Sequence, residues 1–72
     1  MELSDVARLY DEAAKELELA AQHCRVASTH FGNEEVPRGS AHAWAAYGHL
    51  MEAQGRMHEQ ARAHAKRAVP QA

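Results

Sequence analysis

Residues 3–31, LSDVARLYDEAAKELELAAQHCRVASTHF, contain the pattern that decides the fold. Apolar or small residues recur there at alternating intervals of three and four, without a polar interruption. They are Leu3, Val6, Tyr10, Ala13, Leu17, Ala20, Cys24, Ala27 and Phe31. This spacing places them on one stripe of an α-helix, and such a stripe is typical of a helix that packs against another helix.

The residues at the two ends of this stretch predict a helix over 4–31. Ser4 and Asp5 favour the start of a helix, because short polar side chains accept hydrogen bonds from the first free backbone N–H groups. Gly32 favours its end, because glycine readily adopts the left-handed conformation that closes many helices. The glycines and the proline of GNEEVPRG predict a loop over 32–39.

The second half of the chain predicts another helix, over 40–69. Ser40 can cap its start, and Pro70 prevents its continuation. Gly48 and Gly55 are its weakest positions, because glycine is a weak helix former, and a bend or break near Gly55 is the main alternative to a continuous helix. Its inner stripe is predicted to contain Trp44, Tyr47, Met51, Gln54, His58, Ala61, Ala65 and Ala68.

Two independent patterns favour an antiparallel hairpin as the single domain of residues 1–72. Folding the helices back through the predicted loop sets large residues against alanines, for example Tyr10 against Ala61 and Trp44 against Ala27. Residues 1–36 contain eight acidic and three basic residues, whereas residues 37–72 contain two acidic and five basic ones. An antiparallel arrangement therefore lays opposite charges side by side.

Composition supports an all-α fold and limits the functional classes. Alanine, the strongest helix former, occupies 16 of 72 positions, and isoleucine is absent. The sequence has no apolar run long enough to span a membrane and no secretory leader, so we expect a cytoplasmic protein, with non-classical export left open. The single cysteine, Cys24, excludes an internal disulfide and is expected to be a structural thiol on the apolar stripe.

Several apolar residues lie off the centre of the predicted seam between the helices. They are Leu9, Leu19, Val26, Leu50 and Met57. A single hairpin would leave these side chains exposed to water. A second copy would cover them most simply, by forming a four-helix bundle with the first. We therefore expect a homodimer, with an unrelated helical protein as the alternative partner.

The six histidines raise the alternative of a metal-binding or metal-sensing bundle. Only His49 and Glu52 have a spacing that lets two side chains of one helix reach one ion. His23 and His30 are seven residues apart, as are His42 and His49. Each pair therefore lies on one helix face but about 10 Å apart along the axis, and its two members could share a metal site only with ligands from another helix. His23, His30, His49 and Glu52 are therefore weak metal candidates, and we expect solvated or interfacial histidines instead.

Gln54 and His58 fall in the middle of the predicted inner stripe of the second helix. A polar group there must be hydrogen-bonded or reach water, so we expect this pair to fix register and oligomeric state. If His58 is enclosed, its protonation would charge the interior, and the dimer would be lost between about pH 6.5 and 5.

No pattern of catalytic chemistry is present in the sequence. A phosphate-binding glycine loop, a nucleophile elbow and a paired acidic dyad are all missing, so we expect no enzyme activity and no bound cofactor. The basic residues near the end of the chain face the acidic first half in the hairpin, and the net charge is −2, so we expect no nucleic-acid partner.

Two family resemblances are partial. The run AWAAYGHLMEAQGRMHEQA, residues 43–61, resembles the first two-thirds of a tetratricopeptide repeat, which would break the second helix at Gly55. Its later positions depart from that motif, and the chain has no second copy of it. The hairpin also resembles small proteins exported by type VII secretion, but their Trp-x-Gly turn is missing, because Trp44 and Gly48 lie within the predicted second helix.

These observations favour a non-catalytic helical module that dimerises and binds other proteins. A histidine-based metal-binding bundle and an exported helical-hairpin effector are the alternatives.

Overall fold

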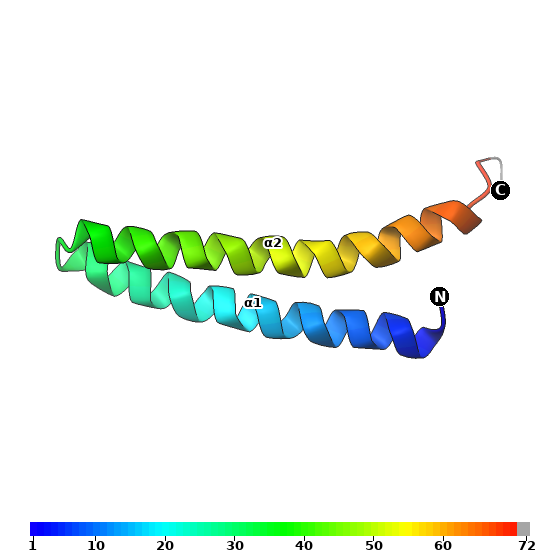
Figure 1. Ribbon diagram of the computed structural model, residues 1–72, viewed down its shortest axis with the longest axis horizontal. Coiled ribbons are helices and arrows are strands. Elements are labelled where there is room, and N and C mark those ends of the chain that lie inside the picture. Colours follow the sequence, from blue (N-terminus) through cyan, green and yellow to red (C-terminus); the bar gives the residue numbers. More distant parts are fainter. Residues whose placement is uncertain (71–72) are drawn as a thin grey trace.

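The computed structural model describes residues 1–70, which form an antiparallel hairpin of two long helices (Figure 1). Helix α1 spans Leu3–Gly32 and helix α2 spans Val36–Arg67. The described residues contain no β-strand, so the predicted all-α hairpin is confirmed. Neither helix combines the length and apolar character that crossing a membrane would require. The molecule measures 54 × 25 × 14 Å. Its smallest dimension, 14 Å, corresponds to the thickness of a single layer of helices.

The connection between the helices is shorter than the predicted loop over 32–39. Gly32 remains in α1, and the chain reverses through Asn33, Glu34 and Glu35. Glu34, rather than a glycine, adopts a left-handed conformation with a φ of 61°. The backbone N–H of Glu35 donates to the carbonyl oxygen of His30 at 2.8 Å, which ties the turn to the last turn of α1.

Helix α2 therefore begins at Val36, not at Ser40 as predicted. Pro37 lies in its first turn, where a residue without an N–H group costs no hydrogen bond. The helix is continuous through Gly55, as the single predicted helix requires, and the alternative of a break there is excluded. It ends at Arg67, two residues before the predicted end at 69.

Small residues occupy the centre of the contact between the helices. They recur every seven residues on both helices and are buried: Ala13, Ala20 and Ala27 on α1, and Gly39, Ala46 and Ala53 on α2. Their size allows the two backbones to approach closely, and the three-residue turn holds the helices together at that end (Figure 1). The centre of the core of this hairpin is thus a seam of alanine and glycine, and Leu9 is the one large side chain buried beside it within residues 1–70.

The bulky stripe predicted to face the partner helix lies largely outside. On α2 the difference is large, because Trp44 is 74% exposed and Met51 is 56% exposed. On α1, Leu17 and Phe31 are also exposed. The prediction assumed that the largest apolar side chains face inward, but close helix contact selects small ones.

The register also differs from the predicted one, because a shorter turn brings different residues opposite each other. Tyr10 donates a hydrogen bond to Gln60 at 3.2 Å, where the longer loop placed Ala61. Glu12 accepts a hydrogen bond from Arg56 at 3.3 Å, so an acid of α1 does lie beside a base of α2. The sequence pattern therefore predicted the antiparallel direction, but not the register.

Leu9 is the largest fully buried side chain, at 2% exposure. The prediction had placed it outside the seam, at a surface between two copies, and this is wrong. Its position lies one helical turn from Ala13, so it fills the space beside the alanine seam.

Gly39 offers a test of the close contact near the turn. A Cβ atom added to Gly39 would lie 2.7 Å from Cδ1 of the Phe31 ring, whereas one added to Gly48 or Gly55 would meet nothing within 4 Å. We expect Gly39→Ala to lower the free energy of unfolding by about 1 kcal/mol. Overpacking against the Phe31 ring costs about 1–3 kcal/mol, and the better helix propensity of alanine offsets at most about 1 kcal/mol of that cost. Thermal and urea unfolding measure this effect.

The matched controls are Gly48→Ala and Gly55→Ala. Each should raise the free energy of unfolding by about 0.5–1 kcal/mol, because alanine is the better helix former and both sites are open. An equal gain from all three substitutions would contradict the tight contact at Gly39.

Leu9 and Leu19 provide a second matched pair. Leu9→Ala should cost about 2–5 kcal/mol, because it empties a buried site. Leu19 is 38% exposed, so Leu19→Ala should cost less than about 1 kcal/mol. Urea unfolding at one fixed protein concentration compares the two, and similar losses would show that Leu9 does not form the core.

Candidate functional site

The alanine seam separates two different edges of the hairpin. On one edge, α1 carries a row of exposed residues at intervals of seven, which we call the apolar row: Leu3, Tyr10, Leu17, Cys24 and Phe31. On the other edge, histidines and charged residues of the two helices meet. The two edges therefore have different chemistry.

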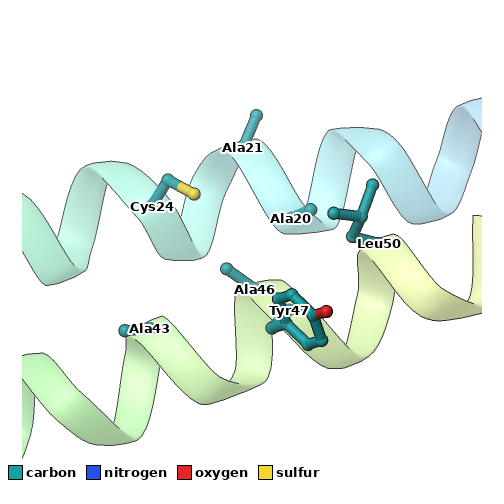
Figure 2. Close-up of a pocket in the computed structure, with 7 residues that line it drawn as sticks. All are labelled: Ala20, Ala21, Cys24, Ala43, Ala46, Tyr47 and Leu50. Carbon is teal, nitrogen blue, oxygen red and sulfur yellow. The ribbon is translucent and has the colours of Figure 1, made fainter.

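A hollow opens between the helices on the side of the apolar row (Figure 2). It has a volume of about 310 Å³. Ala46 and Leu50 project from α2 toward α1, and Tyr47 lies beside them (Figure 2). The full lining is Ala20, Ala21, Cys24, Ala43, Ala46, Tyr47 and Leu50. No charged side chain lines this hollow, so it is suited to receive an apolar side chain.

An aromatic pair extends the apolar surface beyond the hollow. Tyr47 packs against Trp44 in an edge-to-face arrangement, with ring centroids 6.3 Å apart. Both side chains are exposed in the single chain. Aromatic residues exposed in this way are more typical of surfaces that another protein covers than of free surface.

Four histidines form a single file along the opposite edge, which we call the histidine column. Its order is His30, His42, His23 and His49, so that rings from α1 and α2 alternate. Successive ring centroids are 5.5, 5.1 and 5.5 Å apart. Each of the four side chains is partly buried.

A carboxylate holds the ring at each end of the histidine column. Nδ1 of His49 lies 2.7 Å from Oε2 of Glu16 on the other helix. Nδ1 of His30 lies 3.3 Å from Oε1 of Glu35 in the turn. Because a carboxylate only accepts, each of these histidines carries its proton on Nδ1 and directs Nε2 away from the carboxylate.

The centre of the column is a direct contact between imidazoles of the two helices. Nδ1 of His23 and Nδ1 of His42 are 2.9 Å apart. Such a hydrogen bond requires one ring to carry a proton on Nδ1 and the other to offer a lone pair there. At least one of these two histidines is therefore neutral in this arrangement.

Charged residues continue this edge toward the termini. Arg56 donates to Glu12 across the helices at 3.3 Å and to Glu52 on its own helix at 2.8 Å. The hydrogen bond that Arg56 donates to Glu52, together with the charges of Glu52 and Glu12, raises the pKa of the Arg56 guanidinium. Arg8 joins the group through Glu12 at 3.3 Å.

The structure brings together some of the predicted metal candidates and separates others. His23, His30 and His49 belong to the histidine column, whereas Glu52 pairs with Arg56. Within residues 1–70, no three histidine, cysteine or acidic side chains are arranged to hold one metal ion. The sequence showed the two seven-residue histidine spacings. It did not show that the rings of the two helices alternate along one column, because this order depends on the register between α1 and α2.

The remaining predicted site residues have mixed outcomes. Gln54 and His58 are exposed, so the predicted buried polar pair is wrong. The pH-dependent loss of a dimer was conditional on an enclosed His58 and therefore loses its premise. Cys24 is exposed and lines the hollow instead of lying buried in the seam. Of the predicted interface residues, those other than Leu9 keep exposed or partly exposed side chains: Leu19, Val26, Leu50 and Met57.

Comparisons of the chain with protein-family models, with curated proteins and with solved structures found no match. The two edges of the hairpin are therefore the features of the molecule that bear on its function.

Proposed function

We propose that this chain is a non-catalytic helical interaction module that works as a homodimer, in which two hairpins join through the hollow and the apolar row. The second copy supplies the second layer of a four-helix bundle. The observation that carries this proposal is the amount of apolar surface that the single layer leaves uncovered.

The first support is the smallness of the internal core. Among residues 1–70, Leu9 is the only larger side chain that is fully buried, and the other buried apolar side chains there belong to alanines. A domain normally buries its apolar surface between two layers, and chains below about 80 residues without a disulfide or metal need additional stabilisation. A second copy would provide that stabilisation.

The second support is the exposed area. The chain has a mass of 8.0 kDa and exposes 5517 Å². A compact monomer of that mass exposes about 4,450 Å². The excess is about 1,000 Å², comparable to the roughly 800 Å² that each partner contributes to a standard interface.

The third support is the shape of the apolar surface. Alanines make up much of the lining of the hollow, and the larger side chains of Tyr47 and Leu50 also line it. A twofold axis would let the bulky side chains of one copy enter the hollow of the other, because each surface carries both features. The absence of charged residues from the lining favours an apolar occupant.

Ala43 and Ala41 allow a matched test of this interface. Both are exposed in the single chain, but only Ala43 lines the hollow. We expect the native chain to sediment at twice its 8.0 kDa mass, and Ala43→Glu to shift the equilibrium strongly toward the single chain. A buried, unpaired carboxylate in the interface would cause this loss.

The control variant Ala41→Glu introduces the same charge two residues away and should leave the dimer intact. Analytical ultracentrifugation over a range of concentrations measures the mass, and circular dichroism checks the helix content. A native chain that sediments at 8.0 kDa even at high concentration would overturn the proposal, as would equal effects of the two variants.

A further inference from the structure

The histidine column has no role in the proposed dimer, because it lies on the opposite edge from the hollow. Its central contact joins the two helices through His23 on α1 and His42 on α2. Both side chains are only partly buried, so a small solute can reach them from solvent. The geometry of this contact indicates a ligand.

The distance between the two nitrogens suits a metal ion. Ligand nitrogens about 2.0 Å from an ion and at right angles to each other lie about 2.8 Å apart, as in the tetragonal sites of Cu²⁺ and Ni²⁺. The two Nδ1 atoms are 2.9 Å apart. Two imidazoles on different helices therefore have their nitrogens at the spacing of neighbouring ligands, and each ring needs only to turn in place for the two lone pairs to converge on one ion.

The neighbouring rings hold this pair in place. His49 stacks on His23 with an interplanar angle of 12°, and His30 stacks on His42 with an angle of 19°. The outer rings are held in turn by Glu16 and Glu35. Ligands whose orientation is already restricted lose less conformational freedom on binding.

The local charge also favours a cation. Neutral imidazoles are the form that binds metals, and the column is bracketed by two carboxylates. Arg38 offsets part of this charge by pairing with Glu35 at 3.2 Å, whereas the carboxylate of Glu16 contacts only His49 among the ion pairs of residues 1–70.

We propose that Nδ1 of His23 and Nδ1 of His42 bind one divalent transition-metal ion of the Cu²⁺ or Ni²⁺ class. The ion replaces the hydrogen bond between the two rings. The ring that donated this bond moves its proton from Nδ1 to Nε2, so both imidazoles stay neutral. Both rings then turn so that their Nδ1 lone pairs, which pointed along the hydrogen bond, converge on the ion. Water fills the remaining coordination positions.

Bound metal would cross-link α1 to α2 and stabilise the hairpin, because the unfolded chain does not hold the two rings together. The site thus makes the stability of the hairpin depend on a metal ion. It does not depend on the proposed dimer, since both ligands come from one chain.

The test uses Ni²⁺ and the untagged full chain at pH 7.5. Ni²⁺ is the suitable probe because the exposed thiol of Cys24 can reduce Cu²⁺. Isothermal titration calorimetry should show saturable binding of one ion per chain, and saturating Ni²⁺ should raise the melting temperature by several degrees. Protons compete for the same lone pairs, so binding should weaken at least tenfold at pH 5.5.

His42→Gln should weaken Ni²⁺ binding at least tenfold, because glutamine can still hydrogen-bond to His23 but is a poor ligand for this ion. His23→Gln should have the same effect. Circular dichroism of the metal-free variants checks that each keeps its helix content, which separates loss of a ligand from loss of the fold.

His58→Gln and His64→Gln are the controls, because both side chains are exposed and lie outside the histidine column. They should bind Ni²⁺ as the native chain does. The proposal would be overturned by a native chain without saturable binding, by binding that persists when both His23 and His42 are replaced, or by equal losses in the controls.

Discussion

The close approach of two helices along a seam of alanine and glycine is the constraint on which the rest of this structure depends. Side chains of this size allow the backbones to pack tightly, and they leave no room for a leucine or an aromatic ring at the centre. The short turn also keeps the helices close together at one end, because only three residues connect α1 to α2. Larger residues are therefore displaced to the edges.

That displacement separates two kinds of chemistry. Bulky apolar side chains and the hollow lie on one edge, and the histidine column lies on the other. One edge offers apolar surface, which we propose a second copy covers, and the other offers nitrogen lone pairs, which we propose bind an ion. Each edge combines residues from both helices, so neither exists before the hairpin forms.

The wrong sequence predictions share one physical cause. Hydrophobic periodicity identifies which residues share a helix face, but it does not say which of two adjacent faces turns toward the neighbour. Trp44 and Met51 were assigned to the inside because they are large and apolar, yet two helices alone cannot enclose them. The turn residues caused the second error, since Pro37 starts a helix here instead of belonging to the loop.

The sequence by itself determined the helical class, the two-helix division and the antiparallel direction. Alanine content and heptad spacing favour helices through local backbone geometry. The charge asymmetry between the two halves favours the antiparallel direction, because that direction brings opposite charges close together. Only the tertiary structure decided the rotation of each helix and the register between them. These depend on the length of the turn and on the steric fit at Gly39 and the alanines. For the same reason, the interleaving of His23, His30, His42 and His49 became visible only in the folded hairpin.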